Sequence, residues 1–173
     1  MFYGARVFII IGFLIVLSGC GTLKPRIDAS KLSCPETGFL HEAEEMSILD
    51  ADGIELTHIK LDNFSGSCSV SKKGELAVKV DAKLYFYAER NPDAAVTEKQ
   101  DFDYFVTIIS PTGKILAKEV FSTRVELDEE FGVGAIEEEV EQIIPLARLE
   151  QAGLYKIIFG LQLTKDQFNK RKN

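Results

Sequence analysis

Alternation of apolar and polar residues dominates the middle of the chain. Between Glu75 and Arg90, apolar side chains occupy every second position from Leu76 to Ala88, with lysine, aspartate and tyrosine between them. This period of two is typical of a β-strand with one face in a core, because a helix would repeat its apolar positions every three to four residues. The pattern predicts a strand over residues 75–90.

Three further segments have the same strand character. Residues 102–109 and 115–121 are rich in β-branched and aromatic residues, and they flank Ser110-Pro111-Thr112-Gly113. Because proline and glycine suit a tight turn, these two segments predict a hairpin. Apolar residues at every second position over 155–163 predict a long, buried strand near the C-terminus.

Weaker patterns add two or three strands. Residues 54–61 resemble a strand whose alternation shifts after His58, as at a β-bulge, and residues 138–144 are a second candidate. Residues 46–49 fit either a short strand or the end of a helical turn. Six or seven strands joined by short turns predict an all-β fold, an immunoglobulin/fibronectin-III-like β-sandwich.

One segment before the last predicted strand sharpens this fold prediction. Leu149, Ala152-Gly153 and Tyr155 precede the alternating residues. They are similar to the tyrosine corner of immunoglobulin and fibronectin type III domains, where the tyrosine hydroxyl bonds back to the corner backbone. The alternative is that Tyr155 is only a core aromatic at the start of a strand.

The N-terminal segment has the pattern of a secretory signal. Residues 1–19 contain one positive charge, Arg6, then an apolar run over 7–17 and the small pair Ser18-Gly19. As a helix this run is about 17 Å long, well short of a hydrocarbon core of about 30 Å. We therefore expect a cleaved export signal and not a membrane span.

The residues Leu17-Ser18-Gly19-Cys20 resemble the lipobox of bacterial lipoproteins. The resemblance implies diacylglyceryl transfer to the Cys20 thiol, cleavage before Cys20 and acylation of the new N-terminus, so that Cys20 attaches the protein to the lipid bilayer. In that family an aspartate after the cysteine favours the inner membrane, and this chain has Gly21. We expect the outer membrane, facing the periplasm. The alternative is a free Cys20 after an ordinary signal peptide.

Charge and cysteine content narrow the choice of function. Removal of residues 1–19 leaves 173 − 19 = 154 residues and takes away Arg6, so the net charge changes from −7 to −8. The acidic balance argues against nucleic-acid binding, which needs clustered Lys and Arg. Lipidation of Cys20 leaves Cys34 and Cys68 as an even pair in an oxidising compartment, which predicts a disulfide. Two separate, reduced cysteines are the alternative.

The predicted domain organisation has four parts. Residues 1–19 are the signal, 20–33 the lipidated cysteine and a polar, flexible tether, 34–164 the sandwich and 165–173 a basic tail. Within the sandwich, the pattern is least regular between Pro35 and Gly66, the segment that the predicted disulfide would staple.

Three stretches imitate functional motifs without completing them. Ser69-Val70-Ser71-Lys72 fits the S-x-x-K of penicillin-recognising enzymes, but the Ser-Asp-Asn and Lys-Thr-Gly elements are absent. His41-Glu42-Ala43-Glu44-Glu45 lacks the second histidine of a zinc-binding helix. Asp50-Ala51-Asp52-Gly53 begins like a calcium loop but continues with apolar residues, so we expect a turn. We therefore expect no catalytic residue, metal or cofactor.

An acidic segment near the C-terminal third is the remaining charge feature. Residues 126–141 contain eight acids and no Lys or Arg, whereas the tail carries Lys165, Lys170, Arg171 and Lys172. The acids could bind a cationic partner or a divalent ion, and the tail could bind anionic headgroups. The alternatives are a solvated loop and a solubilising end.

The mature chain as a whole resembles a group of Gram-negative lipoproteins with no assigned activity. The shared residues are Cys34-Pro35, Cys68, Arg90 with Pro92, Tyr104-Phe105-Val106, Lys118 with Phe121, Ile144-Pro145 and Gly160-Leu161-Gln162-Leu163-Thr164. Arg90-Asn91-Pro92 departs from the Arg-Gly-Pro turn of the group. The resemblance implies the fold and no chemistry.

Together these patterns predict a membrane-anchored binding or structural module of the envelope, not an enzyme. The expected partner is an envelope protein or a glycan, because a binding module needs an exposed apolar or charged patch and the sequence offers such patches. The alternative is an envelope hydrolase of glycan or peptide with an unrecognised carboxylate site, which would need a polar constellation in a cleft.

Overall fold

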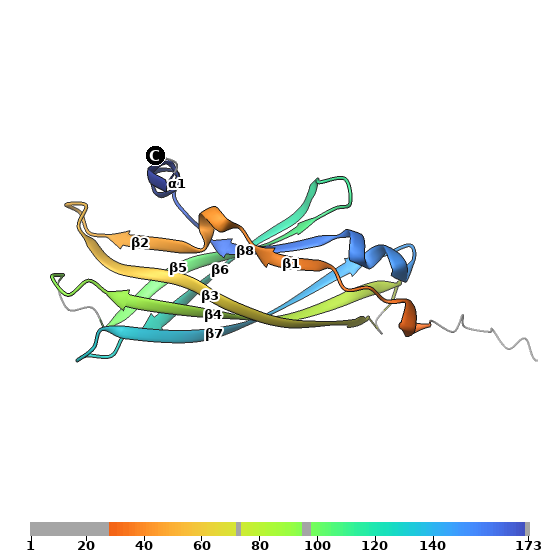
Figure 1. Cartoon of the computed structure of the whole chain (residues 1–173), viewed down its shortest axis with the longest axis horizontal. Helices are drawn as coiled ribbons and strands as arrows, with labels where there is room; N and C mark the ends of the chain where they lie inside the picture. The colour runs from red at the N-terminus through yellow and green to blue at the C-terminus, as the bar shows by residue number, and fades with distance from the viewer. Residues whose placement is uncertain (1–27, 72–73, 95–97, 172–173) are drawn as a thin grey trace, which may run out of the picture.

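The structure is a sandwich of two four-stranded sheets (Figure 1), seen in a computed structural model that describes residues 28–71, 74–94 and 98–171. The predicted signal and Cys20 lie outside the described residues. Sheet A has the order β1 (Glu36–Phe39), β8 (Lys156–Leu161), β5 (Lys99–Ile109) and β6 (Ile115–Glu126). Sheet B has the order β2 (Glu45–Leu49), β3 (Glu55–Val70), β4 (Ala77–Arg90) and β7 (Val133–Pro145). The predicted all-β sandwich is confirmed.

The strand connections follow the immunoglobulin scheme in their central part. In that scheme strands A-B-E-D pack on G-F-C-C′. Here β3, β4 and β7 take the places of A, B and E, while β8, β5 and β6 take those of F, C and C′. Two departures set this chain apart. The place of G is taken by β1, which comes from the N-terminal end and pairs with β8 in parallel, and β2 is added outside β3.

Alternating residues of the long strands build the core between the sheets. The Phe86 ring from sheet B lies 5.1 Å from both the Phe102 and Tyr104 rings of sheet A, centroid to centroid. A second group joins Phe64 of β3 to Phe39 at 5.1 Å and to Phe159 at 5.6 Å. Burial of a large apolar side chain contributes about 1.5–3 kcal/mol, so these aromatic contacts account for much of the cohesion between the sheets.

Several predicted details are confirmed and others are wrong. The hairpin turn at Ser110–Gly113 is present, with Gly113 at φ 80°. The predicted bulge is displaced, because Thr57, Ile59 and Leu61 all face the core and the register with β4 shifts between Leu61 and Asn63. The segment 35–66, expected to be the least regular, contains β1, β2 and most of β3.

Short helices lie at one end and along one side of the sandwich. The 3-10 turns η1 (Ala29–Lys31) and η3 (Leu149–Leu154) contact each other where the described chain begins, while η2 (His41–Ala43) joins β1 to β2. The C-terminal segment, expected to be a basic tail, forms the helix α1 (Lys165–Arg171), which lies beside η2. Residues 28–33, the described part of the predicted tether, belong to the fold because they contain η1, which contacts η3.

Candidate functional site

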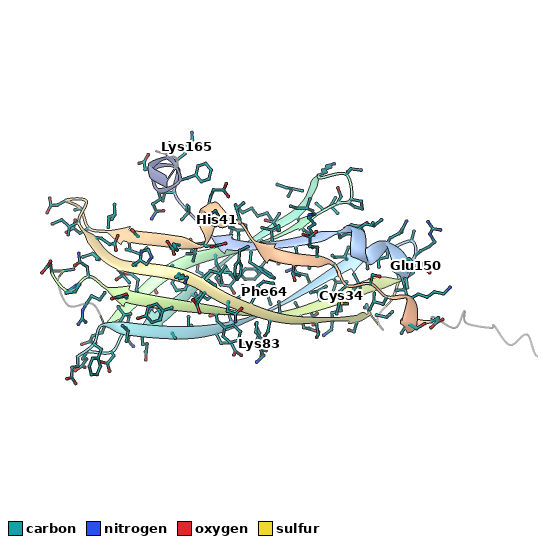
Figure 2. All side chains as sticks on the ribbon, viewed as in Figure 1. Cys34, His41, Phe64, Lys83, Glu150 and Lys165 are labelled. Atoms are coloured by element: carbon teal, nitrogen blue, oxygen red, sulfur yellow. A yellow bond between two sulfur atoms is a disulfide. The ribbon has the colours of Figure 1, made fainter. Side chains whose placement is uncertain are left out.

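The outward side chains of sheet B form a polar surface along its three longest strands. Strand alternation turns Val80 and Ala82 toward the core and Lys79, Asp81 and Lys83 toward solvent. We define the polar face as Ser65, Ser67, Lys79, Asp81, Lys83, Tyr85, Tyr87, Glu137, Glu139 and Glu141. Figure 2 shows Lys83 pointing away from the sandwich, whereas Phe64 points between the sheets.

Two lysines of β4 are each held by two acids on the polar face. Lys83 Nζ lies 2.6 Å from Glu137 Oε1 and 3.1 Å from Glu139 Oε1, both on the neighbouring strand β7. Hydrogen bonds to Glu137 and then Glu139 raise the pKa of Lys83 above its usual range, so the ammonium is charged at physiological pH. The face therefore presents fixed charges of both signs.

Lys79, four residues before Lys83 on β4, is also held by two acids. Its Nζ lies 2.7 Å from Asp81 Oδ1 and 3.2 Å from Glu141 Oε2. Hydrogen bonds to Asp81 and Glu141 raise the pKa of Lys79 as well. Since strand register sets which acid meets which lysine, the pattern follows from the β4–β7 pairing of Asp81 with Glu141.

A shallow hollow of about 600 Å³ lies in the middle of the polar face. Its floor is backbone at Gly66, Ala82 and Val140, because the last two side chains are buried on the core side. Its rim is formed by Ser65, Ser67, Asp81, Lys83, Glu139 and Glu141. The hollow offers hydroxyl, carboxylate and ammonium groups together, which suits a hydrogen-bonding ligand or a polar segment of a partner.

Two tyrosines extend the polar face beyond the hollow. The Tyr85 hydroxyl lies 3.4 Å from Ser65 Oγ at the rim. Tyr87, the next outward residue of β4, is exposed and pairs across the sheet with Lys60. Exposed tyrosines give apolar contact area at low entropy cost, and they are enriched at binding surfaces.

The acidic segment 126–141 is split among three environments. Glu137, Glu139 and Glu141 belong to the polar face, whereas Glu138 turns inward and accepts hydrogen bonds from Tyr104 and Thr123. Asp128 Oδ1 caps the β6–β7 turn by accepting from the backbone N–H groups of Glu130 and Phe131. The segment is therefore neither one solvated loop nor one binding site.

Loops at one end of the sandwich collect ten further acids. Backbone hydrogen bonds bring the β2–β3, β4–β5 and β6–β7 connections together there, as from Arg90 N to Gly132 O and from Asn91 N to Leu56 O. We call this the acidic end; among described residues it holds Asp50, Asp52, Glu55, Glu89, Asp93, Glu98, Glu126, Asp128, Glu129 and Glu130, against Arg90 and Lys99.

The predicted disulfide is present and Cys20 is not placed. Cys34 and Cys68 are bonded, with their Cα atoms 5.7 Å apart. The bridge joins the segment before β1 to β3, and so it ties sheet A to sheet B where the N-terminal segment enters. Cys20, the predicted lipidation site, lies outside the described residues, and its modification stays a prediction.

Tyr155 lies at the corner where η3 leads into β8. Its ring packs against the core, its N–H donates to Ala152 O at 3.1 Å and its carbonyl accepts from Glu36 N at 3.1 Å. Within the described part of the chain no hydrogen bond links its hydroxyl to another residue, so the bond that defines a tyrosine corner is not seen there.

The incomplete motifs occupy ordinary surface positions. Asp50 Oδ1 accepts from the N–H groups of Asp52 at 2.9 Å and Ile54 at 2.8 Å, which confirms the predicted turn. His41 Nδ1 lies 3.5 Å from Glu44 Oε2, and His58 points outward between Glu45 and Glu55. Ser69 is the next-to-last residue of β3, and Lys72 lies outside the described residues.

Among the described residues, no group of three or more His, Cys, Asp and Glu side chains is arranged to hold a metal ion. None of the helices in residues 28–71, 74–94 and 98–171 is long and apolar enough to cross a membrane. Comparisons with protein-family models, with curated proteins and with solved structures find no match for this chain.

Proposed function

We propose that this protein is a lipid-anchored lipoprotein of the bacterial envelope, facing the periplasm from the outer membrane, whose sandwich binds an envelope protein or a glycan through the polar face. The hollow between β3, β4 and β7 carries the binding part of the proposal, since it gathers charges of both signs with Tyr85 at its rim. The anchor rests on Leu17-Ser18-Gly19-Cys20. The Cys34–Cys68 disulfide supports export, because such bonds persist in oxidising compartments.

Crosslinking inside the cell tests the binding surface. A photoreactive amino acid at Tyr87 would sample the polar face, and one at Val120, which is exposed on the outer side of sheet A, is the matched control. We expect a discrete crosslinked species from position 87 and not from position 120. Equal yields at both positions, or none at either, would contradict the assignment of the polar face.

Fatty-acid labelling tests the anchor separately. Cys20→Ala removes the thiol that the lipobox resemblance assigns to diacylglycerol, so we expect the variant to lose both the label and membrane association. Equal label on Cys20→Ala and on the unchanged chain would exclude the anchor, whatever the crosslinking shows.

The hydrolase alternative receives no support from the polar face. Its acids Glu137, Glu139 and Glu141 lie in ion pairs with lysine. We propose that the protein is not an enzyme. Purified protein should leave peptidoglycan, peptides and simple esters intact; turnover that one carboxylate substitution abolishes would establish the alternative.

A further inference from the structure

The N-terminal segment enters the sandwich at a defined end, opposite the acidic end. There, Ile109 of β5 pairs with Ile115 of β6 on one side and with Lys156 of β8 on the other. Lys31 of η1 reaches Glu150 of η3 at 3.8 Å. We call this the tether end, made by η1, η3 and the β5–β6 hairpin turn, and Figure 1 shows these elements at the same end of the molecule.

Large aliphatic side chains are exposed at the tether end. Ile115 is 59% exposed, Leu116 52% and Leu154 59%. They come from two elements, the hairpin and η3, that the β5–β8 pairing holds in one region. Leu49, Ile54 and Phe131 are exposed as well, but they lie among the acids of the acidic end, so the two ends differ in the charge that surrounds their apolar side chains.

Charges of both signs balance around these side chains: Lys31, Lys114, Arg148 and Lys156 stand against Asp28, Glu36, Glu75 and Glu150. Lys156 Nζ lies 2.8 Å from Glu36 Oε2, and Lys31 pairs with Glu150 as described. The tether end therefore carries little net charge, whereas the acidic end carries ten acids against two bases among described residues. An anionic surface would repel the acidic end and accept the tether end.

The length of chain before the fold limits how far this end can lie from the lipid. Eight residue steps separate Cys20 from Asp28, the first described residue, and they span at most about 29 Å. With lipid attached to Cys20, Asp28 could therefore lie no farther than about 29 Å from the bilayer surface, a distance similar to the thickness of one hydrocarbon core. The tether end would stay within reach of the lipid.

We propose that the tether end docks on the bilayer, with Ile115, Leu116 and Leu154 inserted among the headgroups and upper acyl chains. The occupant of this apolar surface is thus the lipid membrane. The inference rests on the proposed anchor at Cys20, and it adds a second contact that orients the domain. In that orientation the acidic end faces away from the membrane, and the polar face is open along its length.

Tryptophan fluorescence of the full lipidated protein tests the proposal. The chain contains no tryptophan, so Leu116→Trp and Leu154→Trp each introduce a single reporter at an exposed position. Phe131→Trp, at a position 72% exposed in the β6–β7 turn of the acidic end, is the matched control. The proteins are reconstituted in phosphatidylethanolamine–phosphatidylglycerol vesicles, with and without lipids brominated high on the acyl chain.

We expect bromolipids to quench Leu116→Trp and Leu154→Trp about twofold, because insertion of about 5–10 Å brings the indole to the brominated carbons. Emission from Phe131→Trp should be unchanged. Vesicle flotation of the unchanged chain separates the two proposals. Protein that floats but shows no more quenching at 116 and 154 than at 131 overturns the docking alone. Protein that does not float overturns the anchor and the docking together.

Discussion

The Tyr104 hydroxyl donates a hydrogen bond of 3.4 Å to Glu138 Oε2, and Thr123 Oγ1 donates to the other oxygen of the same carboxylate. Tyr104 and Thr123 belong to sheet A and Glu138 to sheet B, so the carboxylate bridges the two sheets beside their β6 and β7 edges. A half-buried carboxylate is tolerated here because both of its oxygens accept hydrogen bonds.

The Tyr104 phenol should make stability fall in alkali. Burial, and then the charge of Glu138, raise the pKa of Tyr104 above its usual 10.0. Because the folded pKa is the higher one, its contribution is complete below about pH 10 and is lost as the pH rises toward the folded pKa. We expect the unfolding free energy of Tyr104→Phe, measured by urea denaturation, to decline less steeply above pH 10 than that of the unchanged protein.

Glu138→Gln is the control for this pH dependence. Glutamine retains an acceptor but removes the charge that opposes ionisation of Tyr104. The alkaline decline of Glu138→Gln should therefore be intermediate between those of Tyr104→Phe and the unchanged chain. Identical slopes in all three proteins would show that Tyr104 does not titrate differently on folding.

Loss of the disulfide should destabilise the fold without changing it. In the chain-entropy model a loop of this length contributes about 4 kcal/mol, and real bridges often give less. Residues 34 and 68 are separated by 34 positions. We expect Cys34→Ser with Cys68→Ser to lower the unfolding free energy by about 2–4 kcal/mol, with an unchanged β-type circular dichroism spectrum.

Chemical reduction provides the matched comparison for the double variant. Unchanged protein with dithiothreitol should match the variant in stability, and non-reducing mass spectrometry of protein isolated with thiols blocked should find neither Cys34 nor Cys68 alkylated. Alkylation of both cysteines would show that the bridge does not form in the cell.

Gly134 should not accept a side chain. A Cβ added there would lie well inside the van der Waals contact distance of the Glu126 carbonyl oxygen and 2.9 Å from Val125 Cγ2. The conflict involves the backbone at the end of β6, which no rotamer change relieves. We expect Gly134→Ala to lower the unfolding free energy by about 1–3 kcal/mol. Gly38→Ala, where an added Cβ meets nothing within 4 Å, is the control and should have little effect.

The sequence predicted the strands whose local pattern is regular. β4 and β8 were found because every second residue is apolar over most of their length. β5 and β6 were found because β-branched and aromatic residues flank a turn with proline and glycine, although Glu119 and Thr123 interrupt the core face of β6. The second half of β3 was missed for two reasons. The register shift between Leu61 and Asn63 resets the alternation, and the inward positions then include Gly66 between outward serines.

Elements that depend on distant partners were not predictable from local pattern. β1 has four residues and is defined by parallel pairing with β8, more than a hundred residues away. β7 begins at Val133, before the predicted start at residue 138. Its first half was missed because Glu138 points inward and interrupts the apolar alternation, and the hydrogen bonds from Tyr104 and Thr123 that make this charge acceptable come from the other sheet. The polar face was missed likewise, since its lysines and acids meet only through the β4–β7 register.

The helix α1 should depend on one glutamine. Gln167 Oε1 accepts from Thr164 N at 2.7 Å, Thr164 Oγ1 accepts from Gln167 N at 3.2 Å, and Gln167 Nε2 donates to Ser47 O of β2 at 2.8 Å. A helix of seven residues is not stable alone, so it relies on such contacts. Gln167→Ala removes the two bonds made by the side chain, each contributing about 1 kcal/mol.

We expect amide hydrogen exchange over residues 165–171 to become about tenfold faster or more in Gln167→Ala, because 1.4 kcal/mol of local opening free energy corresponds to a factor of ten. Exchange in the core strands β4 and β5 should not change, since they do not contact this side chain. Asn169→Ala, an exposed position on the same helix, should leave the exchange rates as they are. Equally faster amide exchange in both variants would mean that the shortness of the helix, and not the Gln167 side chain, governs the opening of α1.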